Sequence, residues 1–131
     1  MSNFETKRLP VERDAVAIDG PDIRILLGLQ GGGMCHLEFP PGQTSTAITH
    51  KTTEEIWFFL SGQGQMWRLK DGYEEVVAVE AGVCLTIPVG TYFQFRSFGY
   101  VPLVGIFVTI PPWSGYDEDI VVEGKWKPTL P

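Results

Sequence analysis

Apolar and polar residues alternate in short runs along most of the chain, without the apolar spacing of about 3.6 residues that is typical of an amphipathic helix. The runs are rich in β-branched and aromatic residues, and clusters of Gly, Pro, Asp and Ser separate them. Many short strands at close intervals favour an all-β sandwich or barrel. We therefore predict strands at 22–29, 34–39, 44–50, 55–60, 64–70, 74–79, 83–87, 92–96 and 101–110.

The alternation also predicts which side chains face the interior, because successive strand residues point to opposite faces. In "MCHLEF", Cys35, Leu37 and Phe39 share the apolar face, which places His36 and Glu38 outside. In "YFQFR", the two phenylalanines share one face, and the polar residues between and beside them share the other. The phenylalanine face is predicted to be internal.

The run "EIWFFL" differs because it is apolar on both faces. Two sets of residues face opposite ways in it: Glu55, Trp57 and Phe59, and Ile56, Phe58 and Leu60. A small barrel has one interior, so the outer apolar face needs a cover. The cover is either a partner subunit, which predicts a homodimer, or one of the chain's own arms.

The segment after the last predicted strand, 111–131, contains Trp113, Trp126 and several prolines. It is too aromatic for a disordered tail. We expect an extended C-terminal arm that lies across the barrel or across a partner, with the two tryptophans as packing anchors, and a second extended arm at the N-terminus. The chain is then one domain, 1–131, with a barrel core at about 34–110.

The length and net charge of the chain limit the kinds of molecule with which it is expected to interact. With 131 residues the chain is the size of one domain. A net charge of −6 argues against nucleic acid and against an anionic membrane surface. The N-terminal residues include no apolar signal segment, and no apolar run reaches the ~20 residues of a spanning helix. Cys35 and Cys84 are expected to be free thiols, and a cytoplasmic location is the default expectation.

Five residues at fixed spacing then become informative. Gly42 is followed by five residues to Ile48, and then come His50, Glu55 and Gly62. This arrangement resembles the first motif of the cupins, small double-sheet barrels, in which Gly is followed after five residues by His-x-His, then by Glu and Gly. The resemblance implies a jelly-roll fold, also called a double-stranded β-helix.

The second cupin motif is also recognisable. Gly82 is followed by five residues to Pro88, and then come Gly90, Phe93 and Ser97. In the family, Phe93 corresponds to a His and Ser97 to an Asn. Together the two motifs extend the resemblance over 42–97, which is most of the predicted barrel.

The departures from the motifs bear on function. Cupins that bind a metal use two His and one Glu from the first motif and one His from the second. Here Ile48 and Phe93 replace two of these ligands, and only His50 and Glu55 remain. Two protein ligands fall short of the usual three or four. We therefore expect no cofactor, with a divalent metal held weakly by His50 and Glu55 as the alternative.

The residues that share the interior define a candidate site. If His50 and Glu55 face the lumen, they lie among aromatic side chains, and a buried carboxyl and imidazole suit acid–base chemistry. The ligand-contacting candidates are Trp57, Phe59, Phe93, Phe95 and Arg68. Arg68 is an anchor for a substrate carboxylate only if it points inward. Glu54 fits the first motif less well than Glu55 and is predicted to be in solvent.

Three functions stay open from the sequence. The first is a small-molecule-binding cupin with an aromatic lumen. The second is an enzyme of isomerase, cyclase/lyase or dioxygenase type that uses His50 and Glu55 as an acid–base pair or a reduced metal site. The third is a structural protein whose barrel is filled by its own side chains.

Overall fold

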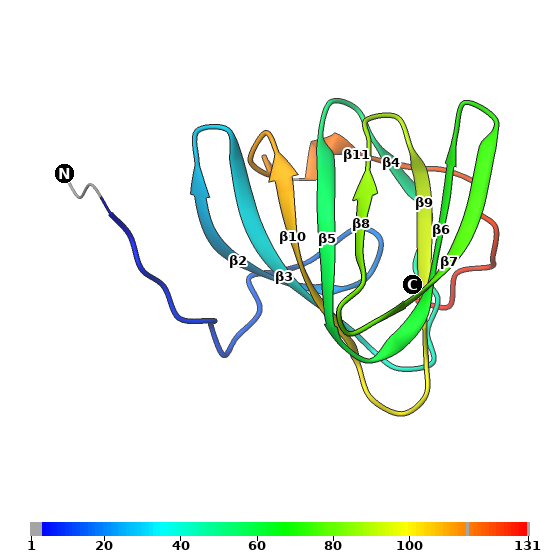
Figure 1. Ribbon diagram of the computed structural model, residues 1–131, viewed down its shortest axis with the longest axis horizontal. Helices are drawn as coiled ribbons and strands as arrows, with labels where there is room; N and C mark the ends of the chain where they lie inside the picture. The colour runs from blue at the N-terminus through cyan, green and yellow to red at the C-terminus, as the bar shows by residue number, and fades with distance from the viewer. Residues whose placement is uncertain (1–3, 115, 131) are drawn as a thin grey trace.

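The computed structural model of the chain describes residues 4–114 and 116–130. Two antiparallel sheets face each other and enclose the core (Figure 1). The first sheet has the strand order β1 (Ala15–Val16), β2 (Asp22–Leu29), β3 (Gly32–Phe39), β10 (Leu103–Ile110), β5 (Glu54–Ser61) and β8 (Cys84–Ile87). The second has the order β11 (Asp119–Val121), β4 (Ile48–His50), β9 (Tyr92–Phe98), β6 (Gln63–Lys70) and β7 (Tyr73–Glu80). The predicted all-β jelly roll is confirmed.

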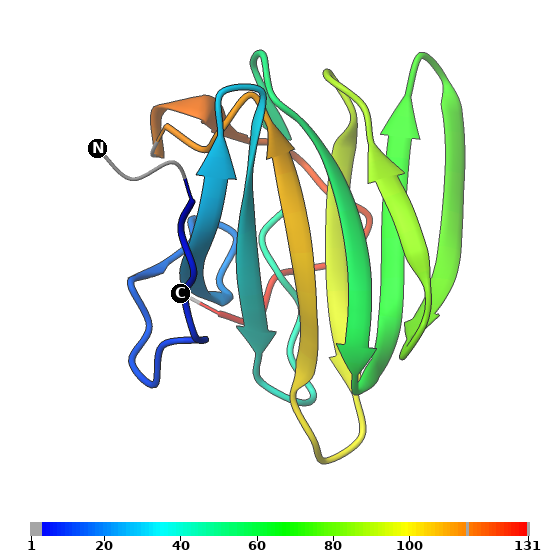
Figure 2. The same cartoon turned by 60° about the vertical axis from the view of Figure 1, so that its left-hand side comes forward.

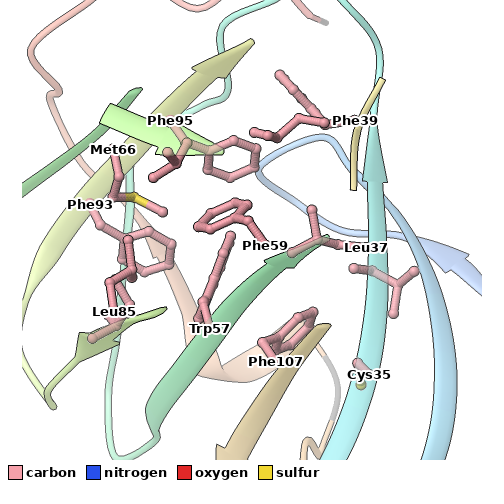
Figure 3. Close-up of a cluster of buried hydrophobic side chains, with 14 of the residues drawn as sticks. Cys35, Leu37, Phe39, Trp57, Phe59, Met66, Leu85, Phe93, Phe95 and Phe107 are labelled. Atoms are coloured by element: carbon pink, nitrogen blue, oxygen red, sulfur yellow. The ribbon is translucent and has the colours of Figure 1, made fainter. Parts of the chain in front are cut away.

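The core lies between the inner faces of the two sheets, where large aromatic and aliphatic side chains interlock (Figure 3). Phe39, Phe59 and Phe95 are fully buried there. Phe39 meets Phe95 edge to face across the core, with ring centroids 4.8 Å apart. Each such side chain contributes about 1.5–3 kcal/mol through removal from water. The faces predicted from the alternation of apolar and polar residues are therefore the faces that the structure buries.

Two predicted strands are shorter than expected. Of the segment 44–50, only Ile48–His50 is a regular strand. Residues before it are joined to β9 by a single bridge at Thr44 and by the hydroxyl of Ser45, which accepts the Phe95 amide at 3.0 Å. The last strand begins at residue 103 instead of 101, because the proline before it has no N–H to donate to a ladder.

His36 lies on the outer face of β3, as predicted, yet it is buried. Its neighbours in the ladder, on the same outer face, are Arg24 on β2 and Ile106 on β10. Burial, together with the charge of Arg24, lowers the pKa of His36. His36 is therefore a neutral imidazole at neutral pH and lies outside the lumen.

The C-terminal arm begins at the edge of the second sheet opposite β7 and then runs across the sheet toward β7 (Figure 1), where Lys125 lies 3.7 Å from Glu74. Its strand β11 pairs with β4. Further along, the Gln94 side chain donates to the Trp126 carbonyl and accepts from the Trp126 amide, at 2.8 and 2.9 Å. The Arg96 guanidinium stacks over the Trp126 ring at 4.1 Å. A Cβ at Gly124 would lie 2.4 Å from the Gln94 side chain, so the arm fits closely.

The outer face of the first sheet stays apolar and open to solvent. Ile56, Phe58 and Leu60 on β5 are 44%, 40% and 44% exposed. The N-terminal segment runs beside this sheet near β2 (Figure 2), and Lys7 donates to the Ile25 carbonyl at 2.6 Å. The chain's own arms therefore leave much of this face in contact with water.

Helical structure among the described residues includes the short turn η1 (Tyr116–Glu118). Across 4–114 and 116–130, no helix is long and apolar enough to cross a membrane. Cys35 is buried, Cys84 is exposed, and both are free, as expected.

Candidate functional site

A small cavity lies between the two sheets, bordered by the C-terminal arm and by the loop before β2. Its volume, measured as the space open to the centre of a water molecule, is about 40 Å³. That is room for about three waters, since each needs roughly 10–15 Å³ by this measure. Its wall is formed by Ala17, Asp19, Pro21, Ile23, Leu37, Ile48, His50, Glu55, Trp57, Phe93, Phe107, Trp113 and Asp119. The wall is thus mainly apolar, with four titratable side chains.

His50 and Asp119 form the central polar contact of the cavity. Pairing of β11 with β4 places Asp119 directly opposite His50. The His50 Nε2 lies 3.0 Å from the Asp119 Oδ1, and both side chains are 7% exposed. Burial by itself would lower the pKa of His50. The hydrogen bond to Asp119 and the negative charge of Glu55 outweigh it, so the pKa of His50 is raised.

Residues 116–118 hold this contact in place. The Glu118 carboxylate accepts hydrogen bonds from the backbone amides of Thr52 and Thr53, in the loop that follows His50. The Lys51 amide also donates to the Glu118 carbonyl at 3.2 Å. The arm is therefore fixed to the β4–β5 loop one residue before Asp119, which sets the position of that carboxylate.

Glu55 enters the cavity from the first residues of β5. Because Glu55 and Trp57 are two residues apart on one strand, they share a face, and the Trp57 Nε1 donates to the Glu55 Oε1 at 2.8 Å. Burial raises the pKa of Glu55 to about 7, even though His50 and the Trp57 hydrogen bond oppose that rise. The carboxyl is therefore partly protonated at neutral pH.

Asp19 is a third carboxyl at the same cavity, and it comes from the loop before β2. It is 5% exposed. Burial, followed by the charges of Asp119 and Glu55, raises the pKa of Asp19 to about 7. Three carboxyls and one imidazole thus line the cavity.

The arrangement is suited to proton transfer. Among the described residues, the Nδ1 of His50 has no hydrogen-bond partner. An imidazole oriented through one nitrogen by a carboxylate leaves the other nitrogen free to give or take a proton. Glu55 also has one oxygen that Trp57 does not occupy. One cavity therefore contains an imidazole whose pKa is raised and a carboxyl whose pKa is about 7.

The residues present do not fit a metal centre. At two of the positions where the family places ligands, the structure has Ile48 and Phe93, side by side in the β4–β9 ladder. The His50 Nε2 is already bonded to Asp119, and one Glu55 oxygen to Trp57. Within 4–114 and 116–130, no three His, Cys, Asp or Glu side chains come together in a group that could hold a metal ion.

The structure brings only some of the predicted residues to the cavity. His50, Glu55, Trp57 and Phe93 line it. Phe59 and Phe95 do not, because the tight packing of the core buries them completely. Arg68 does not line it either: its guanidinium is bonded to Glu75 on β7 and to the Thr86 carbonyl on β8. Arg68 therefore links the two sheets away from the cavity.

The wall residues that were not predicted as part of a site include Asp19, Trp113 and Asp119. Trp113 lines the cavity, in contrast to the expectation that it only anchors the arm. The one available signal was the acidic run "YDEDIVV", in which carboxylates precede a β-branched segment. Such a pattern predicts a short strand but not the strand with which it pairs.

Comparison with known proteins gives one family. A family model described as the cupin domain matches residues 35–109. An uncharacterised protein of Methanocaldococcus jannaschii, MJ1618, is 32% identical over 82 residues. That alignment covers 63% of this chain and 62% of the relative, so less than two-thirds of the relative's length is matched.

Solved structures agree with the fold. One is an uncharacterised Klebsiella pneumoniae protein with a double-stranded β-helix domain, at a TM-score of 0.66 and 16% identity, covering 95% of this chain and 100% of that one. A second is Streptomyces Pac13 solved with uridine, at a TM-score of 0.69 and 15% identity, covering 91% and 92% of the two chains. Pac13 is described as a nucleoside dehydratase. At these identities the likeness concerns the fold alone.

Proposed function

The chain belongs to the cupin family, and from this premise we propose that its lumen binds a small molecule and moves a proton on it, with His50 and Glu55 as the acid–base pair. One observation supports this most directly. The His50 imidazole is held by Asp119 through Nε2 and has its Nδ1 unpaired, in the cavity that also contains a carboxyl with a pKa of about 7. A binding site without chemistry would not need such a pair.

The roles follow from the two pKa shifts. With its pKa raised, His50 is protonated in a larger fraction of molecules than an ordinary imidazole, and it acts as the general acid through Nδ1. Glu55, with a pKa of about 7, is ionised in a large fraction of molecules and acts as the base. Asp119 positions the imidazole and stabilises its charged form. An elimination or isomerisation needs this combination, because one group removes a proton while the other protonates the leaving or receiving atom.

The fold relationship is compatible with this chemistry. Pac13, which covers nearly the same length, is described as a nucleoside dehydratase, so a barrel of this kind can carry out an elimination. The cavity here, at about 40 Å³, is far smaller than the ~300–1,000 Å³ of common ligand sites. The reacting group is therefore small, or it is the end of a larger molecule that displaces the arm at Trp113.

The test is conversion of a mixture of small polar metabolites, followed by mass spectrometry. We expect the wild-type protein to deplete a compound, and Glu55→Gln and His50→Gln to slow that depletion by about 10²–10⁴-fold, the usual contribution of a general acid or base. Glu54→Gln is the matched control, because Glu54 is the preceding residue and is exposed. Equal depletion by Glu55→Gln would overturn the proposal, as would an activity that a chelator removes and a divalent metal restores.

We also propose that the chain is a homodimer that uses the outer face of its first sheet. The face is apolar across three neighbouring strands, with Met34, Ile56, Phe58, Leu60, Val104, Ile106 and Val108. A flat patch without charge at its centre is complementary to itself about a twofold axis. Such a contact is isologous, because each copy offers the same surface to the other.

The size of the patch indicates what else takes part. Three strands at ~4.8 Å spacing, over six residues of ~3.3 Å each, span ~290 Å² in projection. One partner of a stable interface buries ~800 Å². The N-terminal segment can supply more, because it borders a wide groove of about 850 Å³ that continues the face at Met34 and Val108. In the N-terminal segment, the apolar side chains of Phe4 and Val11 are 87% and 88% exposed and can add to the buried area.

Light scattering during size-exclusion chromatography tests the dimer. We expect twice the chain's mass of 14.6 kDa for the wild type. Phe58→Lys, at the centre of the patch, should give the monomer, whereas Tyr100→Lys should not, because Tyr100 is exposed in a loop elsewhere. A wild-type monomer at every concentration would show that another partner, or none, covers this face.

A further inference from the structure

The charges of the cavity wall are unbalanced. Three carboxyls, from Asp19, Glu55 and Asp119, face one imidazole, and the remaining wall residues are apolar. No Lys or Arg lies among the described residues of the wall. Arg68, the residue predicted as an anchor for a substrate carboxylate, is instead hydrogen-bonded to Glu75 and to the Thr86 carbonyl. An anionic ligand would meet repulsion here without a cationic side chain to receive it.

Two of the three carboxyls, those of Asp19 and Glu55, are bonded to no cationic side chain among the described residues. The single imidazole pairs with Asp119 at 3.0 Å. Glu55 receives a neutral donor, the Trp57 indole, at 2.8 Å. Asp19 forms no ion pair among the described residues, and both burial and its acidic neighbours raise its pKa to about 7. A positive charge in the cavity would stabilise the ionised forms of Asp19 and Glu55.

The rest of the wall suits a cation of small size. Trp57, Phe93, Phe107 and Trp113 supply aromatic rings at the cavity. The first three are close together, with the Trp57 centroid 6.0 Å from Phe93 and 5.4 Å from Phe107. Ring faces attract a cation within about 6 Å, most strongly where water is excluded. About 40 Å³ admits only a few non-hydrogen atoms.

We propose that the ligand of this lumen is a small protonated amine, or the amine end of a longer molecule, held by Asp19 and Glu55 against the aromatic wall. This inference rests on the proposed function in one respect: it assumes that the same cavity binds the ligand. It adds the class of substrate: an ammonium group, and neither a carboxylate nor a phosphate.

Calorimetric titration with methylammonium chloride tests it, with sodium acetate as the anion of similar size. We expect saturable binding of methylammonium and none of acetate. Binding should release between about 0.5 and 1 proton at pH 7, because a cation favours ionisation of two carboxyls that are near half-protonated there. Proton release is measured by repeating the titration in buffers of different ionisation enthalpy. The affinity should fall roughly tenfold from pH 8 to pH 6.

Variants locate the site. Asp19→Asn and Glu55→Gln should each weaken methylammonium binding by at least about tenfold, whereas Glu54→Gln should leave it unchanged. Near-ultraviolet circular dichroism shows whether each variant is folded. If neither cavity variant folds, the proton release and the pH dependence of the wild-type protein decide the question alone.

The outcomes separate this inference from the acid–base proposal. Binding of acetate, methylammonium binding without proton release, or displacement of methylammonium by stoichiometric Mn²⁺ would overturn the amine assignment. If a neutral or anionic metabolite is depleted and methylammonium does not bind, the amine class is wrong and the acid–base function stands. If methylammonium binds with proton release and no metabolite is depleted, the amine class stands and the acid–base function is wrong.

Discussion

Removing the charge of Asp119 should lower the pKa of His50 by a large and measurable amount. Asp119→Asn keeps an oxygen that can accept the hydrogen bond from Nε2, so the change is mainly electrostatic. With 3.0 Å between Nε2 and Oδ1, charge centres ~4 Å apart interact by ~4 kcal/mol at an effective dielectric constant of ~20. Because one pKa unit corresponds to ~1.4 kcal/mol, the pKa of His50 should fall by at most ~3 units. Measured effects of a neighbouring opposite charge span about 1–3 units.

The assay is a pH titration of the histidine Cε1–H signals by heteronuclear nuclear magnetic resonance. The chain has two histidines, so the spectrum contains two such signals. The pKa of His50 starts above its usual 6.5 and should fall below it in Asp119→Asn. His36 is an internal control, because it lies on the outer face of β3 and should titrate unchanged. A shift of His50 smaller than about 0.3 units would refute the Asp119–His50 contact and the role assigned to the arm.

Two further predictions concern stability. The pKa values of Asp19 and Glu55 are raised to about 7 from their ordinary values of 3.8 and 4.5, so between these values the folded state binds more protons than the unfolded state. The free energy of unfolding should therefore fall as pH rises from 5 to 8, by about 3 kcal/mol for the coupled pair, in urea titrations; a rise would contradict the burial of these carboxyls. Gly124→Ala should lower the free energy of unfolding by about 1–3 kcal/mol, because its Cβ would collide with the side chain that holds the arm, whereas Gly31→Ala has nothing within 4 Å and should change it little.

Much of the barrel could be predicted from the sequence because its determinants are local. Alternation with a period of two depends only on neighbouring residues, and it identified the buried faces at Leu37, Trp57 and Phe93. The fixed spacing of His50 and Glu55 likewise follows from one turn and one strand. These features are encoded within a few residues of the positions that they describe.

The rest of the site could not be predicted because it depends on contacts between distant segments. Asp119 meets His50 only because β11, a strand of three residues, pairs with β4. Asp19 lies in a loop without periodicity, and its burial comes from packing of the whole barrel. The same limit explains Phe59 and Phe95, since alternation predicts an inward face without distinguishing a filled core from the wall of a cavity.

The acidic residues at the two ends of the chain have a consequence for how such proteins diverge. Asp19, Trp113 and Asp119 all lie outside 35–109, the part that matches the cupin domain. The barrel core and these three residues of the cavity wall are therefore encoded by different segments of the chain. A descendant that kept the barrel and exchanged either terminal extension would change the acidic residues of the cavity wall. The packing of the core phenylalanines would stay as it is. Classification by the shared core would group such proteins by architecture and would not register a change in these residues of the cavity wall.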